Sequence, residues 1–258
     1  MVKLNISFAG AGRVAGSLCD EMFHAGLKIV HIVSESEKNG PEIAVRCNAQ
    51  WSDKLIFPEN CELIMVSVPD HRLEAVLSQI RCSDRAIVVH TAGSFGLEVF
   101  PSRISRSGVF YPLQTFSKGR HIEYNNLPIL LESADPSIIK VLRDLALILG
   151  SKPYVMDAGR RMMMHLAAVF VCNFTNFMLT AGEKVVSEAQ MPFDLLVPLI
   201  RETISKAIEN GPGMSQTGPA LRHDLNTIQK HLDLLSFSPE LQSMYREISG
   251  SIMHYYNN

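Results

Sequence analysis

The chain has 258 residues, and 47% of them are hydrophobic, which is enough for the apolar cores of one large or two ordinary domains. A formal net charge of -2 at pH 7, without a cluster of lysines or arginines, argues against binding to nucleic acid or to a membrane surface. The five cysteines show no CxxC spacing and the N-terminus shows no signal segment, so we expect a cytoplasmic protein with reduced thiols and no metal site.

Short β-rich runs alternate with helical stretches over residues 1–156, a pattern typical of a parallel sheet with helices on its faces. The predicted strands are residues 4–9, 29–33, 63–68, 86–90, 108–111, 127–131 and 153–156. The predicted helices between them are residues 13–25, 41–47, 71–80 and 136–149. We therefore predict an α/β domain over residues 1–156.

The stretch "ISFAGAGRVAGSL" follows the first predicted strand and leads into a helix. Its Gly10, Gly12 and Ala15 match the G-x-G-x-x-G/A motif of Rossmann-type dinucleotide-binding domains. The motif predicts a turn in which the backbone of Gly10, Ala11 and Gly12 approaches a pyrophosphate, with Arg13 and Val14 at the N-terminus of the helix that faces it. The alternative is a glycine turn that merely joins strand to helix.

The end of the second strand, "HIVSESEKNG", bears on the choice of dinucleotide. Ser34 occupies the position that often carries an acid for the ribose of NAD. Ser34 and Ser36 could bind a 2'-phosphate and Arg13 could add charge, whereas Glu35 would repel it. We expect NADP, with NAD possible.

Two later strand ends should reach the same ligand. Because ligands bind beyond the carboxyl ends of parallel strands, Val68, Pro69 and Asp70 are predicted to line the dinucleotide, although Asp70 could simply cap the next helix. In "AIVVHTAGSFG", His90 ends a strand beside the expected nicotinamide position. It is either structural or catalytic.

The strand signals stop after Asp157, where we place a boundary between domains 1–156 and 157–258. The predicted helices of the second domain are residues 160–190, 193–210, 219–235 and 239–256. Thr217 could cap the third of these, with Arg222 and Asp224 in its first turns. Arg222 would either bind a substrate carboxylate or form a surface ion pair.

Residues 162–182 contain no Asp, Glu, Lys or Arg and are long enough to cross a bilayer. At about 100° per residue, however, His165, Asn173, Asn176 and Thr180 form one polar stripe. A lipid-facing helix would not favour that stripe. We therefore expect a buried helix of a soluble domain, with one polar face.

Six motifs together resemble Rossmann-like oxidoreductases of the broad superfamily that includes 6-phosphogluconate dehydrogenase and pyrroline-5-carboxylate reductase. They are "GAGRVAGSL", "VSVPD", "VVHTAG", "YPLQTF", "HLAAVFVCNF" and "TGPALRHD". More narrowly, the chain is similar to NADP oxidoreductases whose C-terminal half is a domain of unknown function. Two departures stand out: Tyr111 replaces the histidine of His-Pro-Leu, and His223 replaces the glycine of Arg-Gly-Asp.

The resemblance implies an all-helical second domain whose long first helix passes beneath the cleft and helps to form a homodimer. It also implies hydride transfer between NADP and a small C=O or C=N substrate. His165 is the expected proton donor because its ordinary pKa suits neutral pH, with His90 second. Asn173 would orient the substrate and Asn176 would contact it, or both would hydrogen-bond within the helices. A dinucleotide sensor without turnover and a metabolite-binding scaffold are the alternatives.

Overall fold

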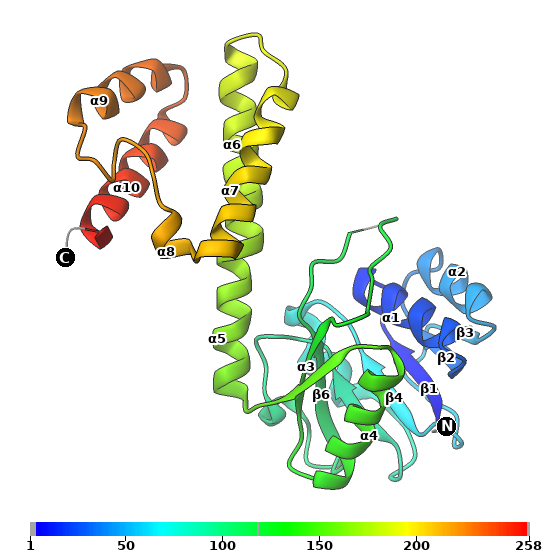
Figure 1. The fold of residues 1–258 in the computed structure, drawn as a ribbon. Coiled ribbons are helices and arrows are strands. Elements are labelled where there is room, and N and C mark those ends of the chain that lie inside the picture. Colours follow the sequence, from blue (N-terminus) through cyan, green and yellow to red (C-terminus); the bar gives the residue numbers. More distant parts are fainter. Residues whose placement is uncertain (1–3, 118, 257–258) are drawn as a thin grey trace. The chain divides into compact units, whose positions relative to one another are not determined.

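The computed structural model describes residues 4–117 and 119–256 (Figure 1). Contacts divide the chain into two units, one ending at Cys172 and one beginning at Asn173. Strands end at Val155 and helices take over from Ala158. The division by contacts falls later because the helix that begins at Ala158 packs on the sheet unit. Whether residues 157–258 fold as a domain stays a prediction.

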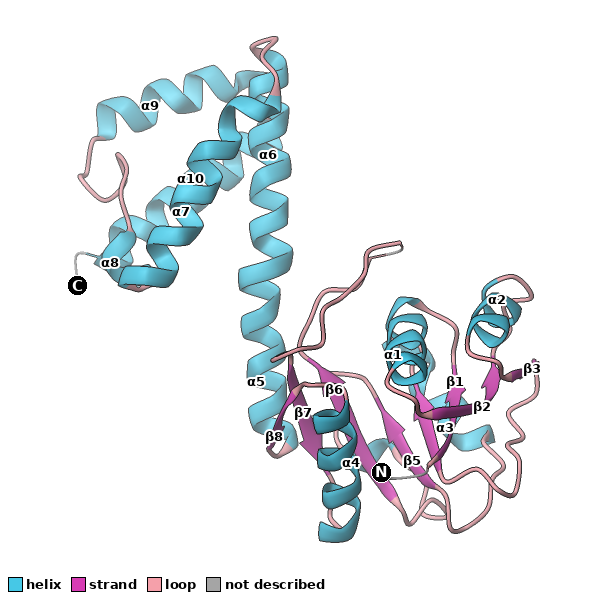
Figure 2. Cartoon of the chain, turned by 45° about the vertical axis from the view of Figure 1, so that its right-hand side comes forward, coloured by secondary structure: helices cyan, strands magenta, loops and turns pink. Residues whose placement is uncertain are grey.

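The first unit is built on an eight-stranded sheet with the order β3-β2-β1-β4-β5-β6-β7-β8 (Figure 2). The strands of the described chain are β1 (Asn5–Ala9), β2 (Lys28–Val33), β3 (Gln50–Ser52), β4 (Leu63–Val66), β5 (Ile87–His90), β6 (Ser107–Pro112), β7 (Pro128–Glu132) and β8 (Lys152–Val155). Every neighbouring pair is parallel except β6 and β7. The predicted α/β class is confirmed, and all seven predicted strands are present. The sequence missed β3, a three-residue edge strand too short for an alternating pattern.

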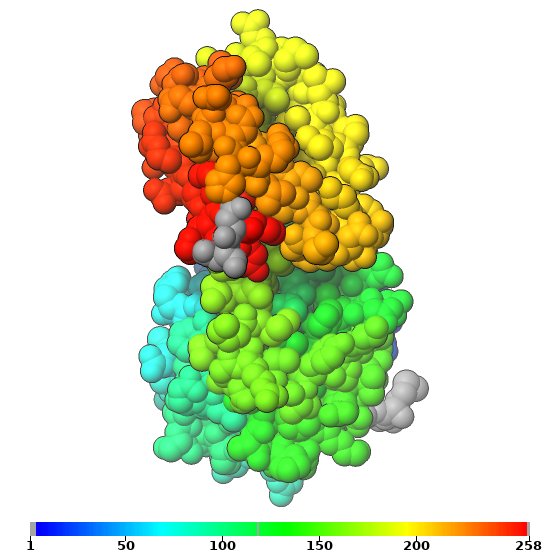
Figure 3. Space-filling view, turned by 60° about the vertical axis from the view of Figure 1, so that its left-hand side comes forward, coloured from blue at the N-terminus to red at the C-terminus, as the bar shows by residue number. Residues whose placement is uncertain are grey.

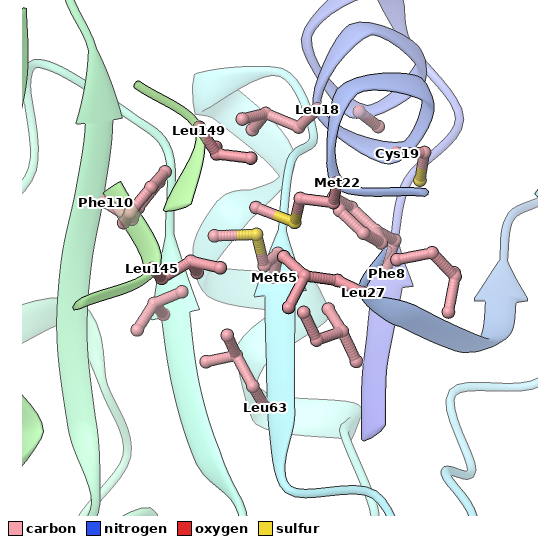
Figure 4. Close-up of a cluster of buried hydrophobic side chains, with 14 of the residues drawn as sticks. Phe8, Leu18, Cys19, Met22, Leu27, Leu63, Met65, Phe110, Leu145 and Leu149 are labelled. Atoms are coloured by element: carbon pink, nitrogen blue, oxygen red, sulfur yellow. The ribbon is translucent and has the colours of Figure 1, made fainter. Parts of the chain in front are cut away.

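Helices cover both faces of this sheet, and β4 shows why the chain needs them. Leu63 and Met65 of β4 enter one core, whereas Ile64 and Val66 enter the other, because successive side chains point to opposite faces. The first core is closed by α1 (Arg13–His24), α2 (Asn39–Arg46) and α4 (Pro136–Ile148), and part of it is shown in Figure 4. The second core is closed by α3 (Asp70–Gln79) and by the 3₁₀ turn η1 (Leu97–Val99).

The long apolar stretch forms α5 (Ala158–Ala168), a π-helix (Val169–Phe174) and α6 (Thr175–Glu188). The sequence predicted one continuous α-helix here. Hydrogen bonds in a π-helix run from i to i+5, so the 100° step assumed for the polar stripe does not hold across these six residues. The stripe of His165, Asn173, Asn176 and Thr180 is therefore not established.

The predicted burial of this stretch is wrong for the single chain. Met163, Phe170 and Val171 are 66%, 59% and 73% exposed, and side chains of α5 are open to view in Figure 3. Among the described residues, the helix Ala158–Glu188 is long and apolar enough to cross a membrane by length and composition. A single helix with these properties is weak support for a span, because helices that pack against other protein meet the same criteria.

The second unit continues from α6 through η3 (Phe193–Leu196), α7 (Val197–Asn210), α8 (Pro212–Ser215), α9 (Leu225–Leu234), η4 (Leu235–Phe237) and α10 (Pro239–Tyr256). The predicted helix start near Pro219 is wrong. Asp224, not Thr217, caps α9, because its carboxylate accepts a hydrogen bond from the Thr227 amide at 3.0 Å. Arg222 consequently lies in the turn before α9, and the next residue, His223, adopts a positive φ of 53°.

Candidate functional site: the carboxyl edge of the sheet

The turn after β1 requires glycine at its first position. Gly10 has a φ of 111°, and its N–H donates to the Val33 carbonyl at 2.8 Å. A Cβ added at Gly10 would lie 2.1 Å from the Ser67 carbonyl oxygen. The backbones of β1, β2 and β4 therefore meet at this point, which is also where the order of the strands reverses.

The N-terminus of α1 is left without a side-chain cap. Gly12 is its N-cap residue, and the first bond within the helix runs from the Gly16 N–H to the Gly12 carbonyl at 2.9 Å. The preceding helical amides, which include those of Arg13 and Val14, have no partner within the helix. A Cβ at Gly12 would meet no atom within 4 Å. Open space and free amide donors at a helix N-terminus are what a pyrophosphate needs.

A cavity of about 1150 Å³ opens at this turn and continues past α3. The residues that line it include Gly10, Ala11, Gly12, Ser34, Ser36, Val68 and Pro69, for which the sequence predicts a role in cofactor binding. The volume is sufficient for a dinucleotide, since pockets for drug-sized ligands hold about 300–1,000 Å³. The residues present therefore fit the group that the glycine motif predicts.

The expected ribose end contains a charge that the sequence did not reveal. Arg72 of α3 forms an ion pair with Glu35, so Glu35 is not the free, repelling carboxylate that we expected. Ser34 Oγ accepts a hydrogen bond from the Trp51 indole at 3.4 Å, and Ser36 Oγ accepts one from the Asn39 amide at 3.0 Å. Both serine hydroxyls are therefore oriented before any ligand arrives.

The turn after β4 is tied to the turn after β5. Asp70 does not cap α3, whose N-cap residue is Pro69, and its carboxylate instead accepts a hydrogen bond from the Ser94 hydroxyl. Thr91 Oγ1 donates to Ser67 Oγ at 3.1 Å. Asp70 therefore acts on the shape of this edge, while its neighbours Val68 and Pro69 face the cavity.

His90 is fully buried at the end of β5, and both of its ring nitrogens are used. Nδ1 accepts from the Ala92 amide at 3.2 Å and Nε2 donates to the Gly96 carbonyl at 3.3 Å. Burial lowers the pKa of His90 to about 4. Neither nitrogen is left for a substrate, so the structure favours His90 as the support of the turn 91–96 and not as a proton donor.

His165, the expected donor, lies in the same unit beside a residue that the sequence did not propose. The Tyr111 hydroxyl at the end of β6 is 2.8 Å from His165 Nδ1, and the two rings pack edge to face. Gly93 backs both rings: a Cβ there would lie 2.7 Å from His165 Nδ1 and 3.0 Å from Tyr111 Cζ. One signal was available in the sequence, since Tyr111 is a polar residue that ends an apolar strand.

Arg161 fixes the helix that carries His165. Its guanidinium is fully buried, pairs with Glu132 of β7 and donates to the Phe95 carbonyl. His165 follows Arg161 by four residues, one helical turn later on the same face. The ion pair therefore sets the position of His165 against Tyr111. The sequence missed Arg161 because nothing in the local sequence distinguishes it from its neighbour Arg160, which is exposed.

Three predicted residues belong to the second unit. Asn173, Asn176 and Arg222 are all exposed there. Their roles toward a substrate stay predictions.

Comparisons with known proteins agree with this description. A model of the Rossmann-like domain matches residues 1–114, and a model of a domain of unknown function, DUF2520, matches residues 127–252. No protein with a curated description matches the chain.

Several solved structures are similar over nearly the whole chain. A "putative NADP oxidoreductase" from Bacteroides fragilis is 35% identical, with a TM-score of 0.89 and 98% of each chain covered. A protein from Thermotoga maritima is 20% identical, with a TM-score of 0.72 and coverage of 97% and 98%. A reductive aminase from Aspergillus terreus, solved with NADPH, is 13% identical, with a TM-score of 0.72 and coverage of 98% and 95%; at such identities these two show the fold alone. The chain therefore belongs to the family of the Bacteroides fragilis protein, in which a Rossmann-like domain is followed by a DUF2520 domain.

Proposed function

We propose that this protein is an NADP-dependent oxidoreductase that transfers a hydride between the nicotinamide and a small C=O or C=N substrate. The observation that carries the proposal is the N-terminus of α1, which has no side-chain cap and opens through Gly10 and Gly12 onto a cavity of about 1150 Å³. The name of the Bacteroides fragilis relative supports the same activity and the same cofactor. The nicotinamide, when bound, supplies or accepts the hydride.

Different residues of this chain would bind the different parts of the cofactor and the substrate. The amides at the start of α1 would hold the pyrophosphate, and Arg72 with Ser34 and Ser36 would hold the ribose and its 2'-phosphate. His165 would exchange the proton that accompanies the hydride. Asn173, Asn176 and Arg222 would orient the substrate.

Isothermal titration with NADPH and NADH tests the cofactor assignment. We expect NADPH to bind at micromolar concentration and NADH more weakly. Thermal unfolding should shift upward with NADPH, because a ligand that binds only the folded state stabilises it. If neither dinucleotide binds at millimolar concentration, the cofactor assignment is wrong and the metabolite-binding scaffold is favoured.

Turnover separates an enzyme from a sensor. NADPH oxidation is to be followed with 2-keto acids, aldehydes and cyclic imines, in wild type and in His165→Ala. We expect the variant to bind NADPH normally and to lose about 100-fold or more in kcat. NADPH binding without turnover of any class would favour the sensor.

We also propose that a second copy of this chain covers α5 and the π-helix. Large apolar side chains are exposed along this segment, and monomers rarely expose apolar patches larger than a few hundred Å². Membrane insertion is the less favoured occupant, because α5 is anchored to the sheet unit through Arg161 and Glu132. Light scattering should give a dimer without detergent. A monomer, or a protein extracted only with detergent, would contradict the proposal.

A further inference from the structure

We propose that Tyr111 is a positioning residue that fixes the tautomer of His165, so that His165 Nε2–H becomes the proton donor to a carbonyl substrate. The proposal rests on the proposed oxidoreductase function and names its substrate class. It also extends the predicted role of His165 to a two-residue proton relay.

The geometry confines the His165 ring on two sides. Tyr111 meets it edge to face, with ring centroids 5.8 Å apart and an interplanar angle of 75°. The backbone of Gly93 lies against the same edge, since a Cβ there would come within 2.8 Å of His165 Cγ. Among the described residues, the Tyr111 hydroxyl is the one hydrogen-bond partner found for the His165 ring, at Nδ1.

The direction of this hydrogen bond follows from the state of the phenol. Burial, and to a smaller extent the carboxylate of Asp70 from α3, raise the pKa of Tyr111, while Arg161 from α5 acts in the opposite direction. Tyr111 therefore keeps its proton near neutral pH and donates it to Nδ1. A neutral imidazole carries a single hydrogen, so an accepting Nδ1 leaves that hydrogen on Nε2.

The proton balance then closes within the pair. A carbonyl carbon that receives the hydride leaves negative charge on its oxygen, and that oxygen takes the proton from His165 Nε2. Nδ1 takes the proton of the Tyr111 hydroxyl at the same time. Afterwards Nδ1 returns this proton to the phenolate and water protonates Nε2, which restores the starting tautomer. The product is an alcohol, and the net proton comes from solvent.

The same balance decides between substrate classes. An N–H donor stabilises an oxygen that becomes negative, but it faces an iminium cation unfavourably, and an iminium needs no proton after the hydride has arrived. A carboxylate would be needed to stabilise an iminium cation, but the carboxylate of Glu132 is paired with Arg161 and that of Asp70 accepts a hydrogen bond from Ser94. The pair therefore assigns carbonyl compounds, and the alcohols formed from them, to this site.

The relay has a pH signature that a purely structural tyrosine lacks. If an imidazolium acted alone as the acid, the rate would fall as rising pH removed its proton. In the relay the proton originates on Tyr111, whose pKa is raised by burial, so the phenol stays protonated. Wild-type kcat should therefore be level between pH 7 and 9, whereas Tyr111→Phe should fall in this interval.

The tautomer can be measured without any substrate. The full chain is labelled with ¹⁵N-histidine, and the His165 signals are identified by their absence in His165→Asn. We expect the Nε2–H tautomer in wild type and a mixture of tautomers in Tyr111→Phe, with an unchanged Tm. An Nδ1–H tautomer in wild type, or one unaltered in Tyr111→Phe, would overturn the proposal.

Kinetics with NADPH provides the second measurement. Tyr111→Phe should lower kcat for 2-keto acids or aldehydes by about 100-fold, with unchanged NADPH affinity. Tyr154→Phe, which removes a hydroxyl from the half-exposed Tyr154 of β8, is the matched control and should leave kcat unchanged. An unchanged kcat in Tyr111→Phe, or turnover of imines alone, would contradict the assignment. Absence of NADPH binding in wild type would instead contradict the proposed function. The NMR measurement would still test whether Tyr111 fixes the tautomer of His165.

Discussion

Two turns at the carboxyl edge of the same sheet use glycine for opposite purposes. After β1, Gly12 borders open space, and the first amides of α1 behind it have no partner within the helix. After β5, Gly93 is buried and makes room for the rings of Tyr111 and His165. The first glycine borders open space, whereas the second makes room for the protein's own side chains.

The comparison teaches that a glycine near a strand end does not by itself indicate a ligand. The two positions differ in what a Cβ would meet, and this is set by residues distant in the chain. Gly93 is 72 residues from His165, whereas the amides behind Gly12 belong to the next residues of the chain. The surroundings of the first turn can therefore be predicted from the neighbouring sequence, whereas those of the second cannot.

The largest effect should come from Gly10, which is crowded by backbone. In Gly10→Ala the added methyl meets the Ser67 carbonyl and the residue must keep a positive φ. We expect a loss of roughly 4 kcal/mol in the free energy of unfolding, or no folded protein. Urea denaturation measures it.

The matched substitution is Gly12→Ala, two residues later in the same turn. Its methyl meets no atom, so stability should change by less than about 0.5 kcal/mol while NADPH affinity falls at least about tenfold. Equal destabilisation of the two variants, or normal NADPH binding by Gly12→Ala, would remove the contrast between crowded and open positions.

Acid should weaken the turn 91–96 through His90. Its pKa is about 4 in the folded protein and about 6.5 when unfolded, so the unfolded chain binds the extra proton. The contribution of neutral His90 to the free energy of unfolding is therefore fully present above pH 6.5, and about 3 kcal/mol of it is lost as the pH drops to 4.

Urea unfolding between pH 7 and 4 measures this loss, with His90→Gln as the variant that does not titrate. Burial lowers the pKa of His31 as well, so the His90→Gln variant should keep part of the pH slope of the free energy of unfolding. Identical pH slopes in the two proteins would show that His90 is not the group responsible.

Gly93→Ala should separate chemistry from cofactor binding. The methyl would push His165 and Tyr111 apart, at a cost of about 2 kcal/mol in stability. NADPH affinity should be retained, because the pyrophosphate turn is untouched, while kcat falls. A variant with normal kcat would mean that the two rings are not required to touch.

The smallest effect should be at the ribose end. Arg72→Leu should lower the preference for NADPH over NADH by about tenfold, or about 1.4 kcal/mol, through loss of a charge partner for the 2'-phosphate. Glu35→Gln frees Arg72 and should raise that preference. Titration of both cofactors against the two variants gives the ratio, and an unaltered ratio in Arg72→Leu would exclude this role.

Much of the first unit could be predicted from the sequence because its signals are local. Runs such as "LIMV" and "IVVH" are apolar on both faces, as central parallel strands must be, and the glycine motif lies within one strand-turn-helix segment. Signals failed where the local pattern is weak or misleading. The π-helix follows an ordinary apolar pattern, and α9 begins six residues later than the proline that suggested its start.

The chain's own order of residues thus determined the layered architecture and the position of the glycine turn, and it singled out His165 as a candidate. Only the tertiary structure decided that Tyr111 meets this histidine, that Arg72 pairs with Glu35, and that both nitrogens of His90 are already engaged. The physical reason is that backbone periodicity depends on neighbouring residues, whereas the state of a polar side chain depends on which distant groups the packed sheet brings within hydrogen-bond reach.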